Sequence, residues 1–581
     1  MKKSLFLFLI NLMTSLFLFA QSDNYIRVVV PGRDSTVIAA KFQRFNASTA
    51  PGSRVTINGE AYRVYPTGAF AGFIPLEPGL NRLVVESVHP VKGTVTKTIY
   101  VESRIPEPEK PVSGFAIEYA QTVPPVDLGL QTGDVLQVRM KALSGCKAAF
   151  MGNKPLYELP ESQTNGIPGI YQGSYTIQPG DTFPKNSIGF TLMNPDGETI
   201  TAASRNRVSI HDGEFPAVGQ TTGSFSYFNY GLGEDRLGGA RIGYLDSLVY
   251  LTLTGRTGDF YHVKLSESQL VYIPTDQVKV LPKGTFAPFS LTDSWSVSGD
   301  KRYDYLKIGL SQHLPYISKY EINPCRIVLD IFGAASNTNW ISQMANAREI
   351  KNVWYEQLER NVMRVTIQLK HQQAWGYAVY YERNRLVVRV KQQPALLEWN
   401  HLTIGLDAGH GGSNIGALGS TGAQEKDINL AVVLKMKAAL EKLGAKTVLT
   451  RQGDETLATL DRWKMWQKAE PDLVLSFHCN SIGNSDPMAV KGTSTYYKYL
   501  AFRPLTEILY DEMLKTGLAE FGNVGSFNFL LNAPTEFPNA LIEMAFMSNP
   551  EDEMKLLDPL FQDRIVRGVV TGLDRFLKQS R

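Results

Sequence analysis

The chain has 581 residues, several times more than one hydrophobic core usually supports, which predicts about four or five domains of ~100 to 200 residues. With 43% hydrophobic and 20% charged residues, the composition excludes an intrinsically disordered chain. A formal net charge of +3 is too small for nucleic-acid binding, which needs a concentrated basic face, so we expect no nucleic-acid partner.

The first residues have the pattern of an export signal. Lys2 and Lys3 precede an apolar stretch over 5–19, and Ala20 is followed by Gln21. This stretch is shorter than the ~20 apolar residues of a membrane-spanning helix, and no later segment is long and apolar enough to span a bilayer. We therefore expect a signal peptide over residues 1–20, no transmembrane anchor after its cleavage, and a soluble, periplasmic mature protein.

Cysteine is too sparse to build a disulfide framework. The three cysteines, Cys146, Cys325 and Cys479, are scattered over three expected domains. Stability must therefore come from hydrophobic cores.

Residues 25–104 alternate short apolar runs with turn residues, as antiparallel strands do. Strands are expected over 54–58, 69–75 and 83–86. The pattern resembles a small bacterial immunoglobulin-like β-sandwich. The proline-rich segment 106–111 that follows predicts a stiff, extended linker.

Two further β-rich modules are expected next. Residues 113–212 show strands and turn signals without helical periodicity, which predicts a second β-sandwich. Residues 215–284 contain short strands and aromatic-rich turns, and resemble a bacterial SH3-like barrel. Its expected strands lie in 238–246, 249–254, 258–265 and 271–274.

Residues 286–392 carry alternating apolar runs that predict another strand-built module. It resembles the AMIN-like module that precedes the catalytic domain of many wall amidases, and this resemblance implies localisation on the envelope. The four expected strands are 305–310, 326–331, 362–369 and 386–390.

After residue 400 the pattern changes to strands alternating with longer helices. This order predicts an α/β domain over 400–581 with a mostly parallel sheet covered on both faces. The expected strands are 403–406, 447–450, 473–477 and 540–542, and the expected helices are 428–443, 457–469 and 560–577.

Polar side chains follow three of these strands directly. His410 comes after the first strand, and His478 and Glu543 end two others. Open α/β sheets bind ligands at the carboxyl ends of their strands, so these residues should converge. Glu425 lies where the first helix begins.

Two histidines and one carboxylate form the ligand set of a catalytic zinc, which leaves the fourth tetrahedral position for water. Imidazole is a borderline-soft ligand and suits zinc better than magnesium. We therefore expect His410, Glu425 and His478 to be the metal ligands.

Five motifs in this region are similar to those of the zinc-dependent N-acetylmuramoyl-L-alanine amidases. They are Asp407-Ala-Gly-His-Gly-Gly412, Glu425-Lys-Asp-Ile-Asn-Leu430, Thr450-Arg451 with Arg462 downstream, Ser476-Phe-His-Cys-Asn-Ser481 and Ile542-Glu-Met-Ala-Phe-Met-Ser-Asn549. The resemblance implies that His410, Glu425 and His478 bind Zn²⁺ and that Glu543 is the catalytic carboxylate. It also implies a peptidoglycan substrate, cleavage between N-acetylmuramic acid and L-alanine, and a role in wall remodelling or daughter-cell separation. The β-rich modules could then meet an envelope or division-site partner.

Other interpretations stay open. Glu425 could be only a charge that favours a helix start. Asp407 and Asn480 could support the ligands, and Cys479 should be a packed thiol because strand alternation points it away from His478. A serine hydrolase would need a G-x-S-x-G elbow, which the sequence lacks. A catalytically silent protein that binds wall or recruits partners remains the alternative function.

Overall fold

The computed structural model describes residues 23–105, 109–211, 215–233, 237–526 and 528–581. The expected signal peptide lies outside the described residues, as do residues 106–108 of the expected linker. Within the described ranges, no helix is both long enough and apolar enough to cross a membrane. The three cysteines are free, as expected.

The first module is a pair of facing sheets, with strand orders β1-β3-β6 and β2-β8-β7-β4-β5. Alternate residues of its strands point inward and form a core around Phe45, Phe70 and Val85. The predicted strand over 69–75 is confirmed with the same bounds. The strands are β1 (Ile26–Val30), β2 (Ser35–Ile38), β3 (Phe42–Thr49), β4 (Arg54–Ile57), β5 (Glu60–Tyr62), β6 (Ala69–Pro75), β7 (Gly79–His89) and β8 (Gly93–Ser103).

The second module forms a sheet of order β16-β15-β12-β13-β14-β11-β9. Two of its strands, β10 and β17, instead pair with each other, and β10 pairs with β21 of the following module. Hydrogen bonding therefore crosses the expected boundary between the two modules. The strands are β9 (Ile117–Thr122), β10 (Leu128–Leu130), β11 (Val135–Ala142), β12 (Lys147–Phe150), β13 (Lys154–Glu158), β14 (Ile170–Thr176), β15 (Gly189–Met193), β16 (Thr199–Ala203) and β17 (Val208–Ile210).

The third module consists of short antiparallel strands, and its buried side chains belong to the same hydrophobic core as those of the fourth module. Its four expected strand regions all contain strands. They are β18 (Ala217–Thr221), β19 (Ser226–Asn229), β20 (Arg241–Leu245), β21 (Tyr250–Thr257), β22 (Phe260–Lys264), β23 (Leu270–Pro274) and β24 (Val278–Val280).

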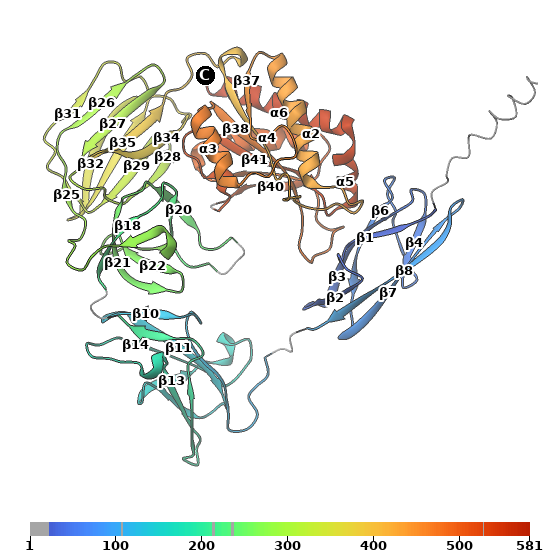
Figure 1. Cartoon of the computed structure of the whole chain (residues 1–581), viewed down its shortest axis with the longest axis horizontal. Helices are drawn as coiled ribbons and strands as arrows, with labels where there is room; N and C mark the ends of the chain where they lie inside the picture. Colours follow the sequence, from blue (N-terminus) through green and yellow to red (C-terminus); the bar gives the residue numbers. More distant parts are fainter. Residues whose placement is uncertain (1–22, 106–108, 212–214, 234–236, 527) are drawn as a thin grey trace, which may run out of the picture.

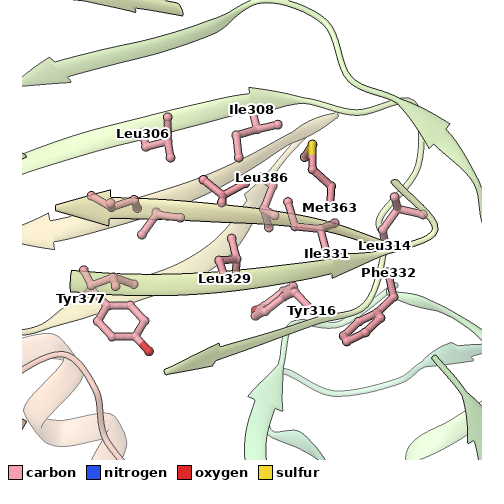
Figure 2. Close-up of a cluster of buried hydrophobic side chains, with 14 of the residues drawn as sticks. Leu306, Ile308, Leu314, Tyr316, Leu329, Ile331, Phe332, Met363, Tyr377 and Leu386 are labelled. Carbon is pink, nitrogen blue, oxygen red and sulfur yellow. The ribbon is translucent and has the colours of Figure 1, made fainter. Parts of the chain in front are cut away.

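The fourth module packs the sheet β31-β26-β27-β35-β34 against the sheet β28-β29-β33-β32. Figure 2 shows the buried side chains between them, among them Leu306, Ile331 and Leu386. Each such fully buried side chain contributes about 1.5–3 kcal/mol. The strands are β25 (Ser290–Leu291), β26 (Trp295–Gly299), β27 (Tyr303–Gly309), β28 (Tyr316–Ile322), β29 (Cys325–Phe332), β30 (Ala334–Ala335), β31 (Ile341–Gln343), β32 (Ile350–Glu359), β33 (Val362–Leu369), β34 (Tyr377–Glu382) and β35 (Arg385–Lys391).

The last module is an α/β domain with a mixed sheet of order β37-β36-β38-β41-β39-β40. The first four strands are mutually parallel, whereas β39 is antiparallel to β41 and parallel to β40. The elements are β36 (Thr403–Ala408), α2 (Glu425–Lys442), β37 (Lys446–Leu449), α3 (Thr459–Ala469), β38 (Leu473–Asn480), β39 (Thr493–Tyr497), α4 (Arg503–Leu514), β40 (Glu520–Gly525), β41 (Asn539–Phe546), α5 (Pro550–Leu557) and α6 (Pro559–Gln579).

Both faces of this sheet are covered. Leu475 and Phe477 of β38 belong to a core shared with α2, α4 and α6, whereas Val474 packs with Trp466 of α3 on the opposite face. This alternation explains why the strand is nearly all apolar in sequence. The same alternation determines the face of the sheet toward which each residue at the end of β38 points.

The first and last modules of the chain lie next to each other. Figure 1 shows the first sandwich, in blue, next to the α/β domain, in orange and red, near α5. Contacts between β6 and α5 and hydrogen bonds between the two modules confirm that they touch.

Candidate active site

Three potential metal ligands meet at the carboxyl edge of the parallel strands. One donor atom from each of His410, Glu425 and His478 lies within 4.8 Å of the others. Glu425 Oε1 is 3.1 Å from His410 Nε2 and 3.1 Å from His478 Nδ1. The geometry therefore brings together the three residues singled out in the sequence.

Local backbone geometry explains how His410 reaches this position. After β36 the chain turns sharply, and His410 adopts a left-handed conformation with φ of 61°, which is costly for a residue other than glycine. Gly409 precedes it because a Cβ there would collide with the imidazole of His478. His410 Nδ1 lies 3.0 Å from Asn414 Oδ1, which orients the ring so that Nε2 faces Glu425.

Glu425 is fixed by backbone and side-chain donors. Its Oε1 accepts hydrogen bonds from Cys479 N at 2.9 Å and Asn429 Nδ2 at 3.2 Å. Its Oε2 accepts one from Ala417 N at 2.8 Å. Burial alone would raise the pKa of Glu425, but hydrogen bonds from the two histidines outweigh it and hold the pKa below its usual value. Glu425 is therefore an ionised, preoriented carboxylate at the first turn of α2.

His478 is more buried than His410 and less buried than Glu425. Burial lowers its pKa, but the hydrogen bond to Glu425 and the neighbouring carboxylates outweigh that effect and raise the pKa to about 9. Its Nε2 is buried, and no residue that the structure describes forms a hydrogen bond with it. A site that concentrates negative charge around imidazole nitrogens favours a cation, and metal ligands bind in the deprotonated form.

Glu543 lies beside the three donors without being one of them. The parallel register of β38 and β41 pairs it with His478. Burial raises the pKa of Glu543 to about 7, and its Oε2 is buried without a hydrogen-bond partner among the described residues. A carboxyl group that titrates near neutral pH is suited to accept and donate protons.

A buried polar layer holds the loop that carries His410. Asp407 accepts hydrogen bonds at 2.6 Å from Thr450 Oγ1, Arg462 Nη1 and Ser476 Oγ. Burial raises the pKa of Asp407, but the charge of Arg462 and the hydrogen bonds outweigh it and lower the pKa overall. Arg462 also donates to the carbonyl oxygen of His410 at 2.5 Å.

Arg451 completes this layer. It donates from Nη2 to the carbonyl oxygens of Lys426 at 2.7 Å and Gly409 at 3.1 Å. The two arginines matched a sequence motif without an assigned role. In the structure Arg451 links the His410 loop to α2, and Arg462 links the same loop to α3. Asn480, by contrast, accepts a hydrogen bond from Ser481 N, and within the described part of the chain it forms none with the three donors.

The structure adds residues that the sequence did not single out. Asn414 orients His410, and Glu553 of α5 holds the segment before α2 by accepting from Ser420 N and Thr421 N, both at 2.9 Å. Asn414 lies only four residues after His410, so its proximity in sequence could have indicated this contact. Glu553 lies more than 130 positions from the loop it holds, and no local pattern marks it. Cys479 is a buried thiol in the core, as predicted.

The arrangement is typical of metal-dependent hydrolases: two imidazoles and a carboxylate around one point, and a separate buried carboxyl group beside them. Comparisons with known proteins agree with this class. Residues 404–575 match the N-acetylmuramoyl-L-alanine amidase family Amidase_3, and residues 294–390 match the AMIN domain.

Individual relatives match the same region. The probable cell wall amidase LytH of Staphylococcus saprophyticus is 30% identical over 206 residues, which covers 35% of this chain and 68% of LytH. N-acetylmuramoyl-L-alanine amidase AmiC of Escherichia coli O6:H1 is 29% identical over 220 residues, or 30% of this chain, and the match spans about half of AmiC, 52%. The solved catalytic domain of CwlV, an N-acetylmuramoyl-L-alanine amidase from Bacillus (Paenibacillus) polymyxa var. colistinus, is 33% identical; the match covers 30% of this chain and 98% of that domain, with a TM-score of 0.29. The chain therefore belongs to the N-acetylmuramoyl-L-alanine amidase family.

Proposed function

We propose that this chain is a zinc-dependent amidase that hydrolyses the amide between the lactyl group of N-acetylmuramic acid and L-alanine in peptidoglycan. The observation that carries the proposal is the pairing of the three-donor cluster with Glu543, whose pKa of about 7 suits proton transfer. Membership of the amidase family supports the same substrate class.

Zinc fits the donor set. Two imidazole nitrogens and one carboxylate oxygen are borderline ligands of the kind zinc prefers, and three protein ligands leave one position for water. We propose that His410, Glu425 and His478 hold the ion. When bound, zinc would lower the pKa of its water toward ~7 and polarise the scissile carbonyl.

The chain's own residues would then move the proton. Glu543 in its carboxylate form accepts a proton from the attacking water and passes it to the leaving amine of L-alanine. Burial keeps the pKa of Glu543 close to neutral, so the group can both accept and release the proton. The buried ion pair of Asp407 and Arg462 keeps the His410 loop in place during this step.

We also propose that the front modules bring the enzyme to its substrate. An immunoglobulin-like sandwich over 25–104, a second sandwich over 113–212 and an SH3-like barrel over 215–284 would contact the wall, and the AMIN domain would contact an envelope or division-site partner. The expected signal peptide over 1–20 would direct the chain to the periplasm. The AMIN match supports the envelope role.

The deciding experiment is mass spectrometry of purified peptidoglycan incubated with the full chain, with and without a chelator. We expect free stem peptides that begin with L-alanine, and none after chelation. If the wall binds the protein but stays intact while zinc is at one equivalent, the catalytically silent wall-binding alternative holds instead.

A further inference from the structure

The first sandwich touches the loops around the metal-binding cluster through one face of β3. Arg44 and Asn46 lie two residues apart on this strand, so they point to the same face. Asn46 is completely buried, and Arg44 is nearly so. Polar side chains at such positions require partners, and their partners lie about 370 to 500 residues away in the α/β domain.

Asn46 joins two of these loops. Its Nδ2 donates to Ser420 Oγ at 2.9 Å and to the carbonyl oxygen of Ser548 at 2.8 Å. Ser420 lies between His410 and Glu425, and Ser548 follows Glu543 by five residues. Both serines are buried.

Arg44 and the strand around it hold a third loop, which follows His478. Arg44 Nη1 donates to the carbonyl oxygen of Ile482, and Arg44 N donates to Asn484 Oδ1 at 2.7 Å. Asn484 Nδ2 in turn donates to the carbonyl oxygen of Phe42 at 2.7 Å. The Asn484 side chain thus bonds to the stretch of β3 that β1 leaves uncovered, since β1 pairs only with residues 46–49.

The three loops are also linked among themselves, because Ile482 N donates to Ser548 Oγ at 3.3 Å. Arg27 of β1 adds a bond to the carbonyl oxygen of Thr421 at 3.2 Å. The sandwich nevertheless leaves the metal-binding cluster accessible. The side chains of His410 and His478 remain 24% and 16% exposed. A module that blocked the site would cover these histidines, whereas a module that only holds the surrounding loops would leave them exposed.

We propose that the first sandwich is a structural part of the active site, in which Asn46 and Arg44 are positioning residues that fix the three loops flanking the metal ligands and Glu543. The catalytic unit is then discontinuous and combines residues 24–103 with residues 400–581. This inference rests on the proposed amidase function for its activity readout, but docking can be measured without it.

Docking is tested by cutting the linker. A specific protease site is inserted between Lys110 and Pro111 of the full chain, and the folded protein is cleaved and passed over a sizing column. We expect the first sandwich to stay bound to the cleaved wild type and to separate from cleaved Asn46→Leu. Separation from the wild type at micromolar concentration would overturn the docking.

Positioning is tested by a matched pair of variants in the uncut chain. Asn46→Leu removes both donated bonds, and Asn206→Leu removes a comparable buried amide that donates to Thr122 Oγ1 at 2.7 Å and Val126 O at 2.8 Å in the second sandwich. We expect kcat of Asn46→Leu on a soluble wall fragment to fall about tenfold or more, because displacements of ~1 Å can cost about a hundredfold. Its zinc content should stay near that of the wild type. Asn206→Leu should stay within about twofold, as expected for a change remote from the site.

Hydrogen exchange gives a readout that a general loss of stability would not reproduce. Asn46→Leu should speed exchange in residues 413–423, 481–492 and 547–549 and leave the core of β38 unchanged. Asn484→Ala, a change at an exposed residue, should affect only 481–492. If both buried variants lose activity equally, or if the loops exchange at wild-type rates in Asn46→Leu, the positioning role is wrong. If the wild type does not cleave peptidoglycan, the proposed function fails while exchange and linker cutting still report on docking.

Discussion

Glu543 offers a substitution whose effects on stability and activity should have opposite signs. The folded protein raises the pKa of this carboxyl group from 4.5 to about 7, chiefly through burial. Below pH 4.5 the group is protonated in both folded and unfolded chains. As pH rises toward 7, the unfolded chain loses this proton more readily, so ionisation progressively destabilises the folded state.

The magnitude follows from the two pKa values. A tenfold change in proton affinity is worth ~1.4 kcal/mol, so a rise from 4.5 to about 7 makes the ionised group cost ~3 kcal/mol at pH 8. At pH 5 the same cost is below about 1 kcal/mol. Glu543→Gln removes the ionisation and keeps the shape, so it should stabilise the metal-free α/β domain at pH 8 and have little effect at pH 5.

Calorimetry of chelator-treated protein measures this difference. For a domain of this size, ~1 kcal/mol shifts Tm by about 2–4 °C, so the transition of the α/β domain should rise by roughly 6–12 °C at pH 8. The same variant with zinc should lose about 10²- to 10⁴-fold in rate while keeping its metal. A nearby dication favours the carboxylate and so lowers the pKa of Glu543 from about 7. The acid limb of the wild-type kcat/KM profile should therefore have an apparent pKa between 4.5 and about 7, and the variant should lack this limb.

Two results would refute this reasoning. A variant with no gain in Tm at pH 8 would mean that Glu543 does not carry a raised pKa in the folded chain. A variant that loses zinc together with its activity would make Glu543 a ligand rather than a proton carrier.

Three further predictions concern the surroundings of the site. His478→Ala should lower zinc content and rate together, as measured by elemental analysis beside the activity assay, because a missing ligand leaves the ion poorly held. Asp407→Asn should destabilise the α/β domain by about 3–5 kcal/mol in calorimetry, since Arg462 would remain buried without its partner charge; an unchanged Tm would contradict that pairing. Gly409→Ala should weaken zinc affinity in a chelator competition, because the new methyl group strikes the His478 ring, whereas Gly525→Ala, at a position with room for a Cβ, should not.

Much of the fold could be predicted because its signals are local. Apolar alternation predicted several strands of the first and fourth modules, among them β6 and β33, and the change to helical periodicity after residue 400 predicted α2, α3 and α6. The convergence of His410, His478 and Glu543 followed from a topological rule, since parallel strands expose their carboxyl ends at one edge.

What the sequence did not reveal depends on long-range packing. β39, β40 and the helix α4 between them were not predicted, and the antiparallel pairing of Ser494 with Glu543 joins residues far apart in sequence, so no local pattern indicates it. Asn46 and Arg44 look like ordinary polar residues of an exposed strand. Only the fold shows that they are buried against loops more than 370 residues away.

The pairing of β10, from the second module, with β21, from the third module, limits how this chain can be shortened. β10 covers the end of β21 at residues 256–257, where backbone groups would otherwise lack a neighbour on that side. Deleting the second module would therefore leave an open sheet edge on the third module, which favours pairing with other chains and aggregation. The second and third modules should therefore be inherited, expressed and exchanged between proteins together, as one folding unit and not as two independent domains.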